Sequence, residues 1–403
     1  MTTKYNAEKL LLNSGNFNND NIPFLKQISP DDTKMLFLKK LRDSVREQIR
    51  FAWRNLDRVV NPVLWLSLFE HERQALLKIV PIFRSQGSYV YGTLNLPAHA
   101  PPQELDIDDG MYLPMAVVES NPKLLHSTMF KIIDEVLEYI ASHNNGWTVD
   151  TNKHTCGRLI TNLGVHIDVN AYAIPDSKIA ALKSMVEARN YSLKGEPAAT
   201  DKEIIDNLDS ASVNLAHRKK GWIISDPQSL KNWVNDTKDT YGNQFIHLSR
   251  IIKAWRDYTW KKGGPSSIGL MAAIYQVYCS NIVKKRLDEG LLQISKALPN
   301  ILSSNIMHPV LPDLALSSPS EDEILEWGYE AKVFANKLEA ALCYSSSREE
   351  CVYKFIECLG DRIPSNPDAV ESSHFEPRTK AFKGSPAVVT NPALSMRNNT
   401  QAG

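Results

Sequence analysis

The sequence is poor in cysteine, and neither sign of charge is in excess. Five cysteines occur among 403 residues, none in a C-x-x-C pair, which excludes a disulfide scaffold and indicates reduced thiols in a cytoplasmic protein. Lys plus Arg number 46, as do Asp plus Glu, which argues against a broad electrostatic surface for nucleic acid or acidic membranes. No apolar run approaches transmembrane length, and the histidines show no zinc-ligand spacing.

What the chain does have is a concentrated acidic stretch, "ELDIDDGMYLPM", beginning at Glu104. Its apolar residues recur at every second position, which predicts a strand. Asp106 and Asp108 would then share one face, and Asp109 would point to the other. A solvated edge strand is the plain alternative, but the flanking residues indicate burial. Buried like charges need protons or a metal, and carboxylates at this spacing suit Mg²⁺.

A second strand is predicted for "VHIDVNAYAI", with Asp168 on its polar face. If it were an antiparallel neighbour of the first strand, Asp168 would lie opposite Asp106 and Asp108. An ordinary surface aspartate is about equally compatible with this stretch. Upstream, Gly87 and Ser88 could bring backbone N–H groups and a hydroxyl to a phosphate, although such pairs also mark ordinary turns.

Seven separated motifs together resemble one known superfamily, the polymerase-β-like nucleotidyltransferases. They are "QGSYVYGTLN", "DIDDGMYLPM", "TCGR", "HIDVNAYAIP", "ISDP", "KAWRD" and "GGPSSIGLMAA". Within the superfamily the chain most resembles the bacterial cGAS/DncV-like nucleotidyltransferases, in particular the DncV-type cyclic GMP–AMP synthases. The resemblance implies an α/β (α+β) fold, in which a polymerase-β-like core carries a long N-terminal spine helix and a helical C-terminal lobe.

The resemblance also implies an activity, a cofactor and substrates. The expected protein is a cyclic dinucleotide synthase of anti-phage signalling (CBASS) that joins ATP and GTP without a nucleic acid template. Two Mg²⁺ ions, or Mn²⁺ in their place, would be held by Asp106, Asp108 and Asp168. The expected nucleotide-binding residues are Gln86, Gly87, Ser88, Tyr89, Val90, Tyr91, Arg158, Ser225, Lys253 and Ser267. There are two alternatives. One is an enzyme of the same fold that makes another cyclic or linear oligonucleotide, and the other is a catalytically inactive nucleotide sensor.

Several of these residues have a structural interpretation as well. Lys253 could extend along apolar surface, Tyr91 could be an ordinary strand residue, and Arg158 could be solvated. Ser225 and Ser267 could be helix N-caps. The sequence also departs from the family after residue 300, where "ILSSNIMHPVLPDLALSS" stands in place of an expected longer, acidic loop with a base-reading carboxylate. Guanine selection is therefore open.

Segment patterns predict three regions, a nucleotidyltransferase core over 1–225, a helical lobe over 226–378 and a disordered tail over 379–403. The Asn-rich residues before Ile28 are expected to be loose. A long helix capped by Ser29 should run to about Val60, and further helices are predicted over 70–80, 176–190 and repeatedly after residue 226. Capping boxes at Ser320 and Ser347 start two of these.

Two features are not explained by catalysis. Arginines recur every four residues along the long helix, at Arg42, Arg46 and Arg50 and beyond, and could clamp an anion or form a solvated face with neighbouring acids. The tail carries Gly403 at its end. The family resemblance implies a ubiquitin-transfer-like partner that acts on this glycine, with an inert tail as the alternative.

Overall fold

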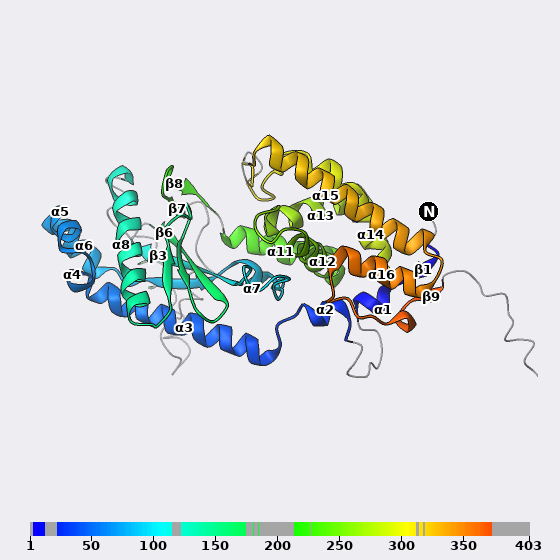
Figure 1. The fold of residues 1–403 in the computed structure, drawn as a ribbon. Coiled ribbons are helices and arrows are strands. Elements are labelled where there is room, and N and C mark those ends of the chain that lie inside the picture. Colours follow the sequence, from blue (N-terminus) through cyan, green and yellow to red (C-terminus); the bar gives the residue numbers. More distant parts are fainter. Residues whose placement is uncertain are drawn as a thin grey trace, which may run out of the picture.

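Figure 1 shows the chain, a computed structural model, as a sheet with its covering helices beside a lobe built mainly from helices. The structure describes residues 3–12, 22–114, 122–174, 213–225, 227–311, 314–316 and 319–372, with the single positions 180 and 184. Within these ranges no helix combines the length and the apolar composition that crossing a membrane requires. The α/β core and helical lobe inferred from the sequence are confirmed.

Among the described residues the core sheet has seven strands, with the order β2-β3-β6-β5-β4 and a β7–β8 hairpin joined to β6. The strands are β2 Ile82–Ser85, β3 Leu105–Pro114, β4 Thr148–Asp150, β5 Gly157–Ile160, β6 Val165–Ile174, β7 Asn214–His217 and β8 Gly221–Ile224. The central pair, β3 and β6, is parallel, so the expected antiparallel pairing was wrong. Since β3 and β6 are far apart in sequence, the intervening helix and strands provide the crossover that a parallel pair needs.

One face of the sheet is apolar and is covered by α3 and α8. Leu105, Ile107 and Met111 of β3 are buried in the same core as side chains of both helices. The helices of this part are α3 Asp32–Arg54, α4 Leu56–Val59, α5 Pro62–Ser67, α6 Glu70–Lys78, α7 Gly87–Tyr91 and α8 Pro122–Ser142. Because side chains alternate along a strand, the polar residues of β3 and β6 are left on the opposite face.

The long spine helix is shorter than predicted, and its cap is a different residue. Asp31 is the N-cap and accepts a hydrogen bond from Lys34 N, so the prediction of Ser29 was wrong. The Ser29 hydroxyl instead donates to Leu25 O at 2.6 Å. The helix ends at Arg54, and α4 follows as a separate short helix. An Asp carboxylate is as good an N-cap as a serine hydroxyl, and it also complements the positive helix end.

The helical lobe confirms the helices expected after residue 226. Its helices are α11 Pro227–Tyr241, α12 Asn243–Thr259, α13 Ser267–Ser280, α14 Leu287–Leu302, α15 Glu321–Glu339 and α16 Arg348–Leu359, with the short turns η3 Ala340–Tyr344 and η4 Pro367–Ala369. Ser320 forms the predicted capping box with Glu323. Ser347 caps α16 by accepting from Glu350 N, but the Glu350 carboxylate bonds Ser346 N and not Ser347 N, so the capping box predicted there was wrong in that half. Gly360 follows the helix with a positive φ of 85°.

The N-terminal segment is not loose where the structure describes it. Its elements are β1 Tyr5–Asn6, α1 Glu8–Leu11 and α2 Phe24–Gln27, and β1 pairs with β9 Glu371–Ser372. Leu10, Leu11 and Phe24 are buried in the core of the helical lobe. The fully buried Asp288 carboxylate also accepts a hydrogen bond from Ala7 N at 2.7 Å. The expectation of a loose N-terminus was therefore wrong for these residues.

Some predictions fall outside the described residues. They include most of the helix expected over 176–190 and the whole of the tail over 379–403, with Gly403. The division of the chain at residue 225 stays a prediction.

Candidate active site

Two aspartates of β3 project from the polar face of the sheet, as the alternation predicted. Asp106 and Asp108 line the main cavity. Asp109 points to the other face, where its carboxylate accepts a hydrogen bond from Arg46 Nε of the spine helix at 2.7 Å. Adjacent aspartates thus have separate roles, one facing the cavity and one joining the sheet to α3.

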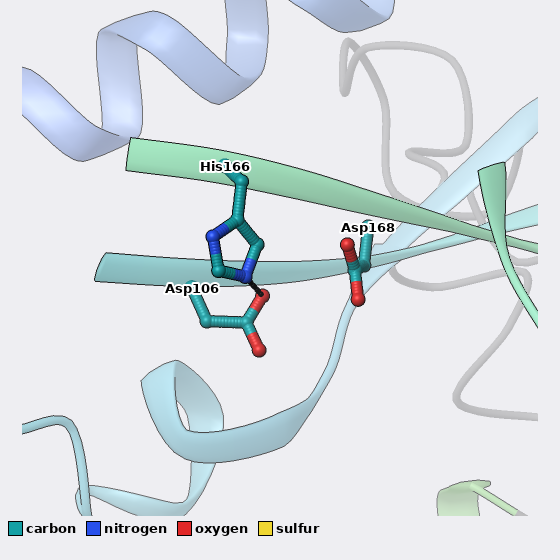
Figure 2. Close-up of side chains that lie close together, drawn as sticks. All are labelled: Asp106, His166 and Asp168. Atoms are coloured by element: carbon teal, nitrogen blue, oxygen red, sulfur yellow. Dashed lines mark ion pairs between the residues drawn. The ribbon is translucent and has the colours of Figure 1, made fainter. Parts of the chain in front are cut away.

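The parallel pairing brings the third carboxylate to the same place. In the register of β3 and β6, Asp168 lies directly beside Asp108, and His166 lies beside Asp106. Ligand atoms of Asp106, His166 and Asp168 all lie within 4.8 Å of one another. Figure 2 shows these three side chains projecting from the two neighbouring strands toward one point.

The electrostatics of the cluster differ between the two β3 carboxylates. Burial and the carboxylates of Asp106 and Asp168 raise the pKa of Asp108 well above its usual value. Burial also tends to raise the pKa of Asp106, but the His166 ring beside it outweighs burial and the net pKa is lowered. His166 Nε2 lies 3.1 Å from Asp106 Oδ1. The cluster therefore carries an excess of negative charge that a bound cation would relieve.

Arg158 of β5 forms a two-point ion pair with Asp168. Its Nε and Nη2 donate to the two carboxylate oxygens, both at 2.6 Å. Burial tends to lower the pKa of Arg158, but the bond to Asp168 reverses this and the net pKa is raised. Arg158 lines the cavity as expected. Its guanidinium is directed at a carboxylate, so a phosphate contact would require it to move.

The Gly-Ser turn packs directly on the carboxylates. Gly87 has a φ of +63°, and a Cβ added there would lie 1.8 Å from Asp108 Oδ2. Gln86 N donates to Asp108 O at 2.9 Å. Only glycine satisfies both the backbone conformation and the close approach. The Gln86 side chain hydrogen-bonds to the hydroxyls of Tyr112 and Tyr172 and so fixes this turn to β3 and β6.

The cavity lies between the sheet and the helical lobe and has a volume of about 620 Å³. It is lined by Asp106, Asp108 and, of the predicted nucleotide-binding residues, by Gln86, Gly87, Ser88, Tyr91, Arg158, Ser225, Lys253 and Ser267. Tyr89 and Val90 are not among the residues that line it. The Tyr89 ring lies under the Arg42 guanidinium, 5.6 Å away. Val90 borders a small neighbouring pocket.

The helical lobe contributes a lysine and a helix start to the cavity. Burial lowers the pKa of Lys253 below that of an ordinary lysine, and its Nζ donates to Thr93 O at 3.4 Å. Ser267 is the first residue of α13, and its hydroxyl accepts a hydrogen bond from Arg256 at 3.0 Å. The N-cap of α13 is Ser266, which bonds Gly269 N, so the cap interpretation of Ser267 was wrong by one residue.

The sequence interpretation missed several cavity residues. His166 is the clearest, since it shares the polar face of β6 with Asp168, and the alternation could have identified it. Its Nδ1 lies 3.4 Å from Glu104 Oε2, and Glu104 also lines the cavity. Arg256 and His308 line the cavity as well. Their positions depend on how the helical lobe packs, which no local pattern reveals.

The arginine row of the spine helix is bound to protein groups. Arg42 and Arg46 both donate to Ser85 Oγ, at 2.9 and 3.0 Å, and Arg50 pairs with Glu47. Of the neighbouring acids expected as partners, Asp43 pairs with Arg42 and Glu47 pairs with Arg50. The bond from Arg46 to Asp109 ties the row to the back of the catalytic strand.

Two families of known proteins match parts of the chain. The family described as "Cyclic GMP-AMP synthase DncV-like, nucleotidyltransferase domain" matches residues 81–172, and "Cyclic GMP-AMP synthase, C-terminal domain" matches residues 242–372. A cyclic GMP-AMP synthase of Vibrio cholerae serotype O1 is 34% identical over 312 residues, which cover 73% of this chain and 70% of the relative. One from Escherichia coli strain TW11681 is 32% identical over 344 residues, covering 80% and 76%.

The solved structures that match the chain belong to the same family as the related sequences. Vibrio cholerae DncV in complex with the linear intermediate 5' pppA(3',5')pG matches with a TM-score of 0.75 at 26% identity, covering 93% of this chain and 100% of that one. The DncV complex with GTP and 5MTHFGLU2 matches with a TM-score of 0.75 at 27% identity, with the same coverage. With the carboxylate-lined cavity, these matches show that the chain is a nucleotidyltransferase belonging to the DncV-like cyclic GMP-AMP synthase family.

Proposed function

We propose that this enzyme joins ATP and GTP into a cyclic GMP–AMP-type dinucleotide. The observation that carries the proposal is the cavity that Asp106 and Asp108 of the sheet line together with Lys253 and Ser267 of the helical lobe. Asp168 lies beside Asp108 on the neighbouring strand. Carboxylates on one wall and phosphate-binding groups on the other are what transfer of a nucleotidyl group between two triphosphates requires.

The residues present fit a pair of divalent cations. Ligand atoms of Asp106 and Asp168 lie within 4.8 Å of each other, and Asp108 is beside Asp168 in the strand register. Burial and these two carboxylates raise the pKa of Asp108, which supports a cation site. Hard oxygen ligands favour Mg²⁺, with Mn²⁺ as an alternative. When bound, two such ions lower the pKa of an attacking hydroxyl and neutralise charge on the leaving pyrophosphate.

The chain's own residues have the following proposed roles. Asp106, Asp108 and Asp168 hold the cations, and Ser88, Lys253 and Ser267 hold the triphosphate. Arg158 exchanges Asp168 for a phosphate when the nucleotide enters, because its fork matches both groups. A ribose hydroxyl oxygen then bonds to the α-phosphorus of the second nucleotide, the bond to pyrophosphate breaks, and the hydroxyl proton passes to Asp168.

Ring closure repeats this step on a linear intermediate. DncV has been solved with the linear intermediate 5' pppA(3',5')pG, which supports a two-step route in this family. A cavity between the lobes that is shared by both nucleotides would let the intermediate turn without leaving. In the second step its remaining triphosphate meets Lys253 and Ser267 in the same way as the first donor did.

The family resemblance supports two further proposals, an anti-phage signalling role and a ubiquitin-transfer-like partner acting on Gly403. Both stand on the resemblance, since Gly403 lies outside the described residues. Removing the last few residues should leave nucleotide transfer unchanged and abolish covalent attachment to other proteins when the partner is co-expressed. Conjugates that persist without Gly403 would refute the partner proposal.

The proposed synthesis of a cyclic dinucleotide is tested by identifying the nucleotide product. Purified protein is incubated with ATP, GTP and Mg²⁺, treated with phosphatase, and analysed by mass spectrometry and linkage-specific nucleases, with Asp106→Asn as the inactive control. A phosphatase-resistant mixed dinucleotide of cyclic mass is expected. A product that loses its terminal phosphates indicates a linear synthase, and the absence of Mg²⁺-dependent pyrophosphate release indicates a nucleotide sensor.

A further inference from the structure

Arg256 of α12 joins this helix to the start of α13 beside the cavity. Its Nη1 donates to Pro265 O at 2.6 Å, and its Nη2 donates to Ser267 Oγ at 3.0 Å. Its Nε donates to the carboxylate of Asp257 at 2.7 Å. Each nitrogen of the guanidinium thus has a protein partner, and the planar fork fixes the directions of the three bonds. The side chain is therefore held in one orientation.

The turn that leads into α13 is packed against the Arg256 side chain. Gly263 and Gly264 have φ values of +84° and +80°, a backbone conformation that favours glycine. A Cβ added at Gly264 would lie 3.1 Å from the Trp260 ring and 3.2 Å from Arg256 Cδ. The turn therefore follows the Arg256 stem closely, and its last residue, Pro265, is bonded to the guanidinium. The position at which α13 begins is thus set by Arg256.

The bond from Arg256 also decides how the Ser267 hydroxyl can act. A hydroxyl has one proton and two acceptor positions. Because Oγ accepts from Arg256, the bond occupies an acceptor position and leaves the proton for another group. The N-cap role belongs to the preceding residue, Ser266, whose side chain accepts from Gly269 N. Ser267 lines the cavity, so its hydroxyl can donate to an oxygen of a ligand there.

Arg256 connects the two groups that are proposed to hold the triphosphate. Lys253 precedes it by three residues on α12, so the two side chains share one helix face, and both line the cavity. Ser267 belongs to α13 and is joined to this face by the Arg256 bond. Two donors bind one ligand best when their separation is fixed beforehand, because ordering them during binding costs free energy. The bonds of Arg256 therefore preorganise Lys253 and Ser267 as a pair.

We infer that Arg256 is a positioning residue for triphosphate binding, which holds the Ser267 hydroxyl as a donor at a fixed separation from Lys253. This inference rests on the proposed function, in which Lys253 and Ser267 hold the triphosphate. Arg256 needs no bond of its own to the nucleotide. The contribution of Ser267 to affinity should therefore depend on Arg256, and Arg256 should not affect a ligand that lacks phosphates.

A double-mutant cycle tests this dependence. Calorimetry in Mg²⁺ measures the affinity of Arg256→Lys, Ser267→Ala and the double variant for an ATP analogue with a methylene bridge between its α- and β-phosphorus atoms. Lysine keeps the positive charge but lacks the planar fork. Each single variant should lose roughly twofold to tenfold in affinity, the value of one hydrogen bond, and the double variant should lose little more than either one. Losses that multiply would show that Arg256 acts independently of Ser267, and would overturn the inference.

Arg250→Lys is the matched control. Arg250 lies on the same helix, and its Nη2 also donates to a serine hydroxyl, Ser29 Oγ, at 2.8 Å, but it is not among the residues that line the cavity. Affinity for the analogue should be unchanged in Arg250→Lys, and Ser267→Ala should lose its full factor in that background. Competition by adenosine, which has no phosphate, should be equal in Arg256→Lys, Arg250→Lys and wild type. Weaker adenosine binding in Arg256→Lys alone would indicate a distorted cavity and overturn the inference.

A second pair of variants keeps Arg256 in place, and so decides the question even if Arg256→Lys does not fold. Gly264→Ala brings a Cβ against Arg256, whereas Gly242→Ala has a similar φ of +79° and no described atom within 4 Å of its Cβ. Only Gly264→Ala should lose about twofold to tenfold in affinity for the analogue. Equal affinities of these two variants would overturn the inference. Failure of the proposed function is distinct, because the wild-type chain would then release no pyrophosphate in Mg²⁺, whereas the dependence of the Ser267 effect on Arg256 is measured as affinity.

Discussion

Replacing Asp108 by asparagine should stabilise the metal-free chain and abolish nucleotide transfer. Asp108 lies beside Asp168 across the parallel β3–β6 pair. Neighbouring strands are about 4.8 Å apart, and two carboxylates at about 5 Å repel by ~3 kcal/mol at an effective dielectric constant near 20. Because Arg158 already offsets the charge of Asp168, we expect a net gain of about 1–2 kcal/mol from the substitution.

The gain should depend on pH in a defined direction. Burial and the neighbouring carboxylates raise the pKa of Asp108 above 3.8 in the folded chain, so the folded state holds this proton more tightly than the unfolded state. The stability that protonated Asp108 gives the wild-type chain is present below the unfolded pKa and is lost as the pH rises through the folded pKa. The difference between Asp108→Asn and wild type should therefore be absent well below pH 3.8 and should grow as the pH rises through the raised folded pKa of Asp108.

The neighbouring Asp109 provides a matched control. Its carboxylate is buried and bonded to Arg46 on the opposite face of the sheet. Asp109→Asn removes the buried negative charge that Arg46 bonds, which should destabilise the chain by about 3–5 kcal/mol. The folded fraction should keep its Mg²⁺ dependence, because this residue does not line the cavity.

The assays are denaturant unfolding without metal and Mg²⁺-dependent pyrophosphate release. Asp108→Asn should lose at least about a hundredfold in rate, since stabilisation by bound cations is worth several kcal/mol. Added Mg²⁺ should stabilise wild type, by about 1.4 kcal/mol at ten times its Kd, and have less effect on Asp108→Asn. Full turnover by the variant, or equal loss of stability in both variants, would refute the reasoning.

Three further outcomes are expected. Gly87→Ala and Gly164→Ala should each lose about 1 kcal/mol of stability, because both positions have a positive φ. Only Gly87→Ala should lose nucleotidyl transfer, because its Cβ would meet Asp108, whereas nothing lies within 4 Å of a Cβ at Gly164. Equal transfer activities of the two variants would contradict this. Lys253→Met should weaken triphosphate binding at least tenfold and Ser267→Ala about twofold to tenfold by calorimetry; the reverse order would return Lys253 to a structural role. Because burial lowers the pKa of Lys253, wild-type affinity should fall as the pH rises through that lowered value, and a Lys253→Met variant that shows the same fall would exclude lysine as the cause.

Local pattern was sufficient for the elements and for the catalytic strands. The period of two in β3 correctly separated Asp106 and Asp108 from Asp109, because side-chain alternation is a property of any extended chain. The caps at Ser320 and Ser347 were also found, since a cap bonds within its own first turn. The cap of the spine helix was misassigned because Ser29 and Asp31 both satisfy the local pattern.

Packing across long sequence distances could not be read from the chain. The parallel β3–β6 register, the burial of Leu10 and Phe24 in the helical lobe, and the Arg46–Asp109 pair each join residues whose separation no periodicity encodes. His166 illustrates the boundary between what local pattern predicts and what only long-range packing decides. Its face was available from alternation, but its contact with Asp106 depends on register.

The sequence by itself therefore determined the helices of the helical lobe, the catalytic strands and their faces and, through its motifs, the family. Only the tertiary structure decided that β3 and β6 run parallel, which partner each charge takes, and that His308 reaches the cavity. The physical reason is that backbone periodicity and capping act within a few residues. Charge pairing and cavity lining are instead set by the burial of apolar faces from distant segments, which is non-directional and becomes specific only when the whole chain packs.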